Sequence, residues 1–259
     1  MTPLTTVMMP ALDAGATIRE SVESALAQTV GDLEVVVVDN GSRVPAADSL
    51  AGIDDPRLRI LRSERNLLIS GGRNAALAVA RSPFVSQLDA DDLWEPDYLE
   101  SVLPRFEDPA VGLVYTNARI LEHPTGHGDY IGDPSVHPMH RFPKIAEQNP
   151  IPCPAATIRA GALRAIGGYC SWMRMVEDYD MYLRLARAGW RFDYVHRQLV
   201  RYRWPTPERG MSHRRREQEL WELVAYLRFV ARHPLTPGPR RQVRTRLRNE
   251  AGRLLDFGR

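Results

Sequence analysis

Residues 33–42 read LEVVVVDNGS, an apolar run that ends in a polar turn. The four consecutive valines are β-branched, and such side chains favour strands. Because the run shows almost no apolar–polar alternation, it is typical of a strand that is buried on both faces of a parallel sheet. The letters DNGS that follow are a strong turn signal. The stretch therefore predicts a central strand with polar side chains at its carboxyl end.

Strands and helices alternate on either side of this run through the first half of the chain. The expected elements are a strand at 7–9, a helix over 17–27, the strand at 33–38, a strand at 58–61, a helix over 73–80, a strand at 84–88, a helix that begins at Pro96 and a strand over 111–115. This alternation predicts an α/β protein with a mostly parallel sheet flanked by helices. Ligands of such sheets bind beyond the carboxyl ends of the strands.

The second half of the chain is less regular. Residues 122–156 are rich in His, Pro and Gly, show no sustained period and predict a long excursion over the site. Beyond them the expected elements are helices at 160–166, 177–188 and 217–232, short strands at 192–195 and 198–204, a Pro-rich linker at 234–239 and a basic helix over 240–255.

The composition excludes several classes of protein. Of 259 residues, 44% are hydrophobic and 25% charged, which is ordinary globular usage. No run approaches the roughly 18 apolar residues of a membrane-spanning helix, and the first residues lack the pattern of a signal peptide. Cys153 and Cys170 match neither a disulfide framework nor a CxxC metal site. We therefore expect a soluble, reduced protein of the cytoplasm.

Charge is distributed unevenly along the chain. The formal net charge is +2, yet residues 214–259 hold twelve arginines against five acidic residues. A basic helix of this kind can bind an anionic membrane surface, here the inner face of the membrane, or it can pair with a second copy of the chain. The alternative is a solvated basic face packed on its own domain. No nucleic-acid partner is expected.

Carboxylates gather at two of the predicted strand ends. The sequence Asp89-Ala90-Asp91-Asp92 follows one strand, and Asp39 ends the valine-rich strand. Two carboxylates spaced two residues apart can face one cavity, and hard oxygen ligands suit Mg²⁺ or Mn²⁺ shared with substrate phosphates. Asp39 could accept hydrogen bonds from a base or a ribose. The alternative at each end is a plain turn, with an Asp as helix cap and Gly41 in an unusual backbone conformation.

Two more polar groups lie at predicted helix starts. Arg73 follows Gly71-Gly72, and a helix N-terminus with an arginine fork is a natural diphosphate site. These glycines match neither a dinucleotide-binding fingerprint nor a P-loop. Residues 177–180, Glu-Asp-Tyr-Asp, open a later helix. Acids there either complement the helix dipole or supply a carboxylate general base at the mouth of a pocket.

In their order and spacing these motifs resemble family-2 glycosyltransferases, enzymes with the GT-A fold that use nucleotide-sugars. The resemblance covers about residues 6–212. The matching segments are 7–11, 24–29, 33–42, 72–76, 87–92, 167–169 and 177–185. Each segment is a weak signal alone, whereas the ordered set is specific.

The resemblance implies roles for particular residues. The positions expected at the nucleotide are Pro10, Ala11, Leu12, Asp39, Asn40, Arg73, Asp89 and Ala90. Among them Asp39 would bind the base, commonly uracil, and Arg73 the base or the phosphates. Asp91, with Asp89, would ligate a divalent Mg²⁺ or Mn²⁺, and Asp178 would be the catalytic base.

The implied activity is inverting transfer of a sugar from a nucleotide-diphospho-sugar to an acceptor hydroxyl, in polysaccharide or glycoconjugate biosynthesis. A UDP-sugar is the favoured donor, and the acceptor would be a sugar, a lipid-linked sugar or a small molecule. The implied organisation is a catalytic domain over 1–213 and a basic helical extension over 214–259. Within the domain, 1–118 would bind the nucleotide, and 119–213 would bind the acceptor and carry the base.

Some positions depart from the family pattern, and these differences bear on the nucleotide and the metal. Leu12 replaces a frequent aromatic residue, and Asn40 replaces the second acid of its turn. Trp204 stands where many members have a histidine, for which His213 could substitute. The spacings of His123, His127, His137 and His140 match no standard zinc site, so zinc is not expected.

Two other functions compete with this interpretation. A sugar nucleotidyltransferase would need a glycine-rich basic loop directly after the first strand, and residues 10–13 are not one. A nucleotide-sugar-binding module without turnover would not need Asp91 and Asp178, and both are present.

Overall fold

The computed structural model describes residues 2–122, 128–131, 145, 149–204, 215–232, 244–245 and 248. No helix in these ranges is both long and apolar enough to cross a membrane. The expectations that fall outside them concern His123, His127, His137, His140, His213, the linker 234–239 and most of the basic helix 240–255. The proposed domain limit at 213–214 also lies outside them and stays a prediction.

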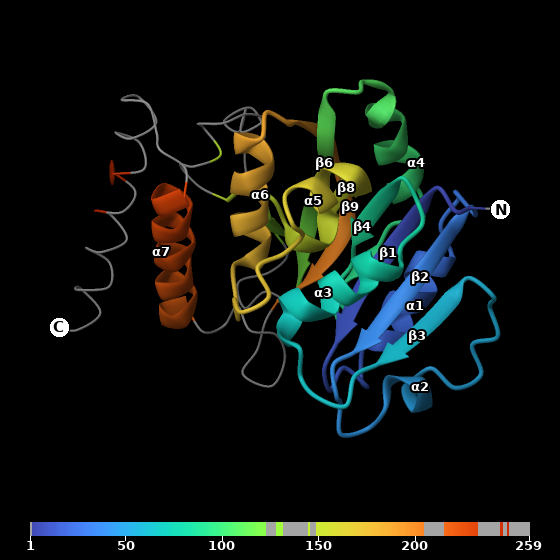
Figure 1. Cartoon of the computed structure of the whole chain (residues 1–259). Helices are drawn as coiled ribbons and strands as arrows, with labels where there is room; N and C mark the ends of the chain where they lie inside the picture. Colours follow the sequence, from blue (N-terminus) through green and yellow to red (C-terminus); the bar gives the residue numbers. More distant parts are fainter. Residues whose placement is uncertain are drawn as a thin grey trace.

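One sheet organises the described part of the chain (Figure 1). Its strands are β1 (Thr5–Ala11), β2 (Leu33–Asp39), β3 (Leu58–Arg62), β4 (Phe84–Gln87), β5 (Leu93–Trp94), β6 (Val111–Leu121), β7 (Gly128–Asp129), β8 (Ala156–Arg159) and β9 (Arg191–Arg203). The strand order is β3-β2-β1-β4-β8-β6-β9-β5, and β7 pairs with β6. The first four strands are parallel, as the alternation of strands and helices predicts. Beyond β4 the sheet is mixed, because β8 runs antiparallel to both β4 and β6.

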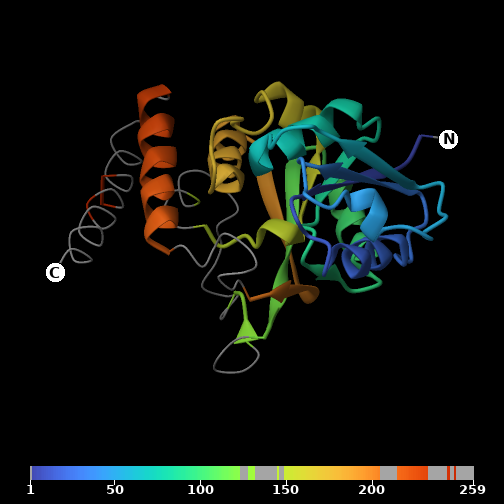
Figure 2. The same cartoon turned by 90° about the horizontal axis from the view of Figure 1, so that it is seen from below.

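Helices cover both faces of the sheet (Figure 2). They are α1 (Ile18–Leu26), α2 (Ala46–Ser49), α3 (Leu68–Val79), α4 (Tyr98–Val102), α5 (Ala160–Ala165), α6 (Glu177–Arg187) and α7 (Arg215–Arg232), with 3-10 turns at Leu103–Glu107 and Cys153–Ala155. Helices α1 and α4 pack on one face of the sheet, and α3, α5 and α6 pack on the other. Helix α7 lies against α6, on the side away from the sheet (Figure 1).

Strand β2 shows why the fold forms around its valines. Val35 and Val37 contribute to the core beneath α1, whereas Val36 and Val38 contribute to the core beneath α3. All four side chains are buried. A strand with apolar side chains on both faces is stable only between two helical layers, so the prediction of a central parallel strand is confirmed.

Two of the expected elements take a different form, and α2, β5, β7 and β8 have no counterpart in the sequence-based expectation. The strands expected at 192–195 and 198–204 are one strand, β9, because its pairing with β6 continues across an irregularity in the register. Helix α3 begins at Leu68 rather than at Arg73. The side chain of Asn66 accepts the amide of Leu68 at 2.7 Å and so satisfies one free amide at the helix start.

The glycines of α3 therefore lie inside the helix instead of before it. A Cβ at Gly72 would lie 2.7 Å from Nδ2 of Asn40 and 3.0 Å from Cβ of Pro10. A Cβ at Gly71 would lie 2.8 Å from Cβ of Leu67. Gly72 therefore allows α3 to pack directly on the ends of β1 and β2, which offsets the low helix propensity of glycine.

Candidate active site

Strand β1 continues beyond the end of its neighbour β4. Pairing of β1 with β4 ends at Met8↔Gln87, whereas pairing with β2 continues to Ala11↔Asp39. Pro10 lies in this unpaired stretch, so its missing N–H removes no hydrogen bond to β4. The strand order also reverses at β1, and ligands of α/β sheets bind at such switch points. The carboxyl ends of β1, β2 and β4 thus meet at one edge.

The turn after β2 packs against both β1 and α3. The amide of Asn40 donates to the carbonyl of Ala11 at 2.8 Å, and its side-chain Nδ2 donates to the carbonyl of Leu68 at 3.2 Å. Asn40 is buried, whereas Leu12, the residue after β1, is 48% exposed. Pro10, Ala11 and Asn40 are therefore brought together as predicted, with Leu12 as an exposed apolar side chain beside them.

Asp39 is held by the turn that it begins. Its Oδ1 accepts the amide of Ser42 at 2.8 Å, and its Oδ2 accepts the amide of Ala46 at 3.0 Å and forms an ion pair with Arg62. Burial alone would raise the pKa of Asp39, but these hydrogen bonds and the nearby guanidinium hold it below its ordinary value. Asp39 is therefore a fixed, ionised carboxylate, and its contact with a nucleotide base stays a prediction.

The acidic turn after β4 concentrates negative charge. Asp92 is buried and accepts the amide of Arg203 at 2.8 Å. Burial, together with the charges of Asp91 and Asp89, raises its pKa well above the ordinary value. Other contacts fix the turn in place, since Thr17 donates to the carbonyl of Ala90 at 2.8 Å. The guanidinium of Arg203 also donates to the carbonyl of Asp91 at 3.1 Å.

Asp89 and Asp91 fit a divalent cation by the chemistry of their donor atoms. In the described ranges no group of three or more His, Cys, Asp or Glu residues forms a ready metal cluster. Mg²⁺ is commonly held by only one or two carboxylates, and the remaining positions are taken by water and substrate phosphates. A cation at this turn would also relieve the repulsion that raises the pKa of Asp92.

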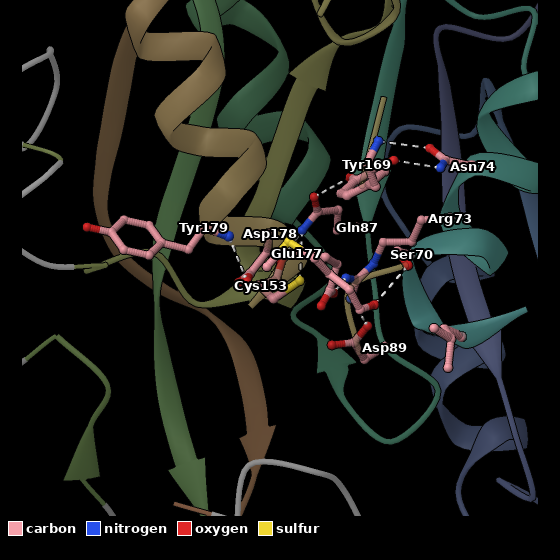
Figure 3. A network of polar contacts seen from close by, with 12 residues as sticks. Ser70, Arg73, Asn74, Gln87, Asp89, Cys153, Tyr169, Glu177, Asp178 and Tyr179 are labelled. Carbon is pink, nitrogen blue, oxygen red and sulfur yellow. Dashed lines mark hydrogen bonds and ion pairs between the residues drawn. The ribbon is translucent and has the colours of Figure 1, made fainter. Parts of the chain in front are cut away.

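Arg73 joins this acidic turn to helix α6, as Figure 3 shows. Its Nη2 contacts Oδ1 of Asp89 at 2.6 Å, and its Nη1 forms a short ion pair with Glu177. The arginine side chain is 1% exposed. The expected place of Arg73 at a helix N-terminus is wrong, because it lies inside α3, and both of its terminal nitrogens contact carboxylates. Contact of Arg73 with the base or the phosphates of a nucleotide stays a prediction. Asp89 and the Glu177-Asp178 pair are thereby brought to one site.

Helix α6 begins with the two acids that complete the site. Burial raises the pKa of Glu177 to about 7, against the opposing effect of Arg73 and with a further rise from the charge of Asp178. Burial likewise raises the pKa of Asp178. The side chain of Asp178 is half-buried, and its Oδ1 accepts the amide of Tyr179 at 2.7 Å.

Several residues of this network have no role in the sequence-based expectation. Asn74 holds the backbone of Tyr169 with two hydrogen bonds of 2.8 and 2.9 Å, and the guanidinium of Arg73 lies over the Tyr169 ring. Gln87 accepts the Tyr169 hydroxyl and donates to Cys153. The motifs around Asn74 and Tyr169 are visible in the sequence, but nothing local indicates that they meet. No sequence signal points to Cys153.

Comparison with known proteins identifies relatives of this chain. The profile of "Glycosyl transferase family 2" matches residues 6–165. Chondroitin synthase of Escherichia coli is 32% identical over 193 residues, which are 72% of this chain and 27% of that protein. The chain therefore spans about a quarter of the length of that relative.

Solved structures agree with the expected fold. S. aureus TarS (1–349) in complex with UDP-GlcNAc has a TM-score of 0.72 at 17% identity, over 96% of this chain and 72% of that one. The mannosyltransferase PcManGT of Pyrobaculum calidifontis, in complex with GDP-Man and Mn²⁺, has a TM-score of 0.72 at 19% identity, over 97% and 74%. These likenesses confirm the expected GT-A-like fold. Because the family profile spans more than half of its residues, the chain belongs to glycosyl transferase family 2.

Proposed function

We propose that this protein transfers a sugar from a nucleotide-diphospho-sugar, in the first instance a UDP-sugar, to an acceptor hydroxyl with inversion at the anomeric carbon. Family membership supports the reaction class. The observation that carries the proposal is the Arg73 bridge, because it joins the acidic turn at Asp89 to the acids at the start of α6. Donor-side and acceptor-side chemistry then belong to one site.

The donor would lie along the edge formed by the ends of β1, β2 and β4. Pro10, Ala11, Leu12 and the Asp39-Asn40 turn would border the base, and Asp89 and Ala90 would face the ribose. Asp89 and Asp91 would hold Mg²⁺ or Mn²⁺, which when bound neutralises the charge that develops on the leaving diphosphate. The buried guanidinium of Arg73 would act by fixing the carboxylate of Asp89.

Asp178 would act on the acceptor. A sugar hydroxyl is a poor nucleophile at neutral pH, so a carboxylate must take the proton of the hydroxyl. As the proton leaves, the hydroxyl oxygen bonds to the anomeric carbon and the bond from that carbon to the diphosphate breaks. The raised pKa of Asp178, caused first by burial, makes its ionised form a stronger base than a free aspartate. A single displacement of this kind inverts the anomeric centre.

Release of nucleoside diphosphate tests the proposal. The full chain would be incubated with a panel of UDP-sugars and GDP-mannose, with Mn²⁺ or with chelator, and with simple sugars as acceptors. We expect catalytic release of UDP that depends on the metal. Saturable binding of UDP without release would instead indicate a binding module, and pyrophosphate release from a sugar phosphate and a nucleoside triphosphate would indicate a nucleotidyltransferase.

Asp91→Asn is expected to weaken metal-dependent UDP binding by at least about tenfold, because one of two carboxylate ligands loses its charge. Calorimetry with UDP in Mn²⁺ and in chelator measures the difference. Asp97→Asn, which removes a surface carboxylate paired with Arg197, is the control and should bind UDP normally. An Asp91→Asn protein with unchanged affinity and unchanged metal dependence would refute the assignment.

The acceptor and any further partner of the chain are also matters for proposal. We propose a hydroxyl of a sugar, a lipid-linked sugar or a small molecule as acceptor. Contact of the basic C-terminal segment with an anionic membrane, or with a second copy of the chain, also stays a proposal. Co-sedimentation with vesicles that contain phosphatidylglycerol, and analytical ultracentrifugation, test these two contacts separately.

A further inference from the structure

The first turn of α6 carries three acids, and two of them form ion pairs with arginines. Glu177 pairs with Arg73, and Asp180 pairs with both Arg184 and Arg228. Within the described ranges, Asp178 has no ion pair with an arginine or lysine. The acid of this turn without an ion pair is therefore Asp178, the proposed base.

Arg228 reaches Asp180 from helix α7. The Asp180 side chain is 1% exposed, its Oδ2 accepts Nε of Arg184 at 2.8 Å, and its Oδ1 forms a short ion pair with Arg228. The remaining nitrogens of Arg184 donate to the carbonyls of Ile166 and Gly168 at 2.8 and 2.7 Å. Asp180 thus joins α7 to the segment that connects α5 and α6.

Tyr226 of α7 holds the residue that directly follows Asp178. The hydroxyl of Tyr179 donates to the carbonyl of Ile145 at 2.7 Å, which uses its single hydrogen, so the Tyr226 hydroxyl donates to the oxygen of Tyr179. The two rings are buried and meet edge to face, with centroids 5.6 Å apart. Figure 3 shows the Tyr179 ring pointing away from the rest of the site.

Helix α7 also contacts the chain before Asp178. Ala225 packs with Cys170 and Met173, and the ring of Trp221 lies 6.0 Å from that of Trp172. The segment that leads into α6 and the residues that follow Asp178 therefore both rest on α7. This helix lies beyond residues 6–165, the part of the chain that the family profile matches.

We propose that Tyr226 and Arg228 are positioning residues of the active site, which hold the first turn of α6 so that the carboxylate of Asp178 meets the acceptor hydroxyl. The inference rests on the proposed role of Asp178 as the base. A displacement of about 1 Å in a reacting group can cost about 100-fold in rate. Each substitution removes one contact and leaves another, since Oδ1 of Asp180 loses Arg228 while Oδ2 keeps Arg184, and Tyr179 keeps Ile145. The turn can therefore loosen while the protein stays folded.

The test compares Tyr226→Phe, Arg228→Met and their double variant in the full chain. For the double variant we expect kcat for UDP release to fall at least about tenfold, while the affinity for UDP with Mn²⁺ stays within about twofold. Arg228→Lys should restore most of the loss seen for Arg228→Met. Hydrogen exchange of residues 177–180 should quicken at least about tenfold, while exchange in α3 is unchanged.

Two variants control for general loss of stability. Tyr98→Phe removes a buried hydroxyl that contacts Thr157, and Arg191→Met removes an ion pair with Asp108. Neither residue belongs to α7 or to the first turn of α6. Both control proteins should keep the wild-type kcat, even where their melting temperature falls as far as that of the α7 variants.

Combination with Asp178→Asn separates the possible results. If α7 acts through Asp178, adding Tyr226→Phe and Arg228→Met to the Asp178→Asn protein causes no further fall in kcat. The inference is overturned if the two α7 substitutions lower kcat of the Asp178→Asn protein as much as they lower kcat of the wild type. Unchanged hydrogen exchange of residues 177–180 in the α7 double variant overturns it as well. Normal turnover of the α7 double variant beside an inactive Asp178→Asn protein overturns this inference alone. Normal turnover of Asp178→Asn overturns the proposed base, and the inference with it.

Discussion

Asp178→Asn is expected to lower kcat for UDP release at least about 100-fold, while UDP binding with Mn²⁺ stays within about twofold. A base acts on the acceptor, so its loss slows chemistry without weakening the donor complex. The hydrogen bond from the amide of Tyr179 survives, because the Asn oxygen can accept it in place of Oδ1 of Asp178. The substitution therefore removes basicity and charge while the local geometry is kept.

The competing explanation is that Asp178 only stabilises the start of a helix. Loss of a helix cap costs about 0.5–2 kcal/mol of stability and does not selectively abolish chemistry. Glu100→Gln is the matched control, since it removes a carboxylate from the first turn of α4 and should turn over normally. Melting temperature, UDP affinity and kcat would be measured on both proteins. A lowered melting temperature with normal kcat would make Asp178 structural.

Arg73→Met is expected to lower the free energy of unfolding by about 3–5 kcal/mol at about pH 8, the usual cost of removing one partner from a buried ion pair. The side chain of Arg73 is 1% exposed and compensates both Asp89 and Glu177. Urea denaturation measures the change. Arg197→Met, from a largely exposed pair with Asp97, should cost no more than about 1 kcal/mol.

The pH dependence of this loss follows from the pKa of Glu177. Burial raises that pKa from 4.5 to about 7 in the folded protein. A carboxyl whose folded-state pKa lies above its unfolded value contributes stability at low pH and loses it as the pH rises through that interval. Removal of Arg73 raises the pKa further, so the deficit of Arg73→Met should be larger at about pH 8 than at about pH 6.

A second substitution tests the cause of that deficit. Arg73→Met with Glu177→Gln should recover part of the stability at about pH 8, since the uncompensated charge is gone. A deficit for Arg73→Met no larger than that of Arg197→Met, or one independent of pH, would show that the bridge contributes little to the fold.

The parallel half of the fold is encoded locally. Residues adjacent in the sequence specify each of its elements. These elements are the four valines of β2, the turn at residues 39–42, the acidic turn at residues 89–92 and the helices with a regular apolar period. Strand burial, turn formation and helix amphipathicity depend on side chains within a few residues of one another. The parallel arrangement of that half, and the gathering of its polar turns at one edge, follow from this local pattern.

The assembly of the active site depends on contacts between residues far apart in the chain. Arg73 and Glu177 are 104 residues apart, and with 34 basic and 32 acidic residues no local pattern indicates which pairs become buried. The close packing of α3 on the sheet likewise depends on how closely Gly72 approaches Asn40 and Pro10. Only the packing of α3, α6 and α7 decides which acids are neutralised. Burial makes an unpaired charge costly, and the buried acids Glu177 and Asp180 both have arginine partners. Asp178 is only half-buried and is the acid of its turn without an arginine partner in the described chain.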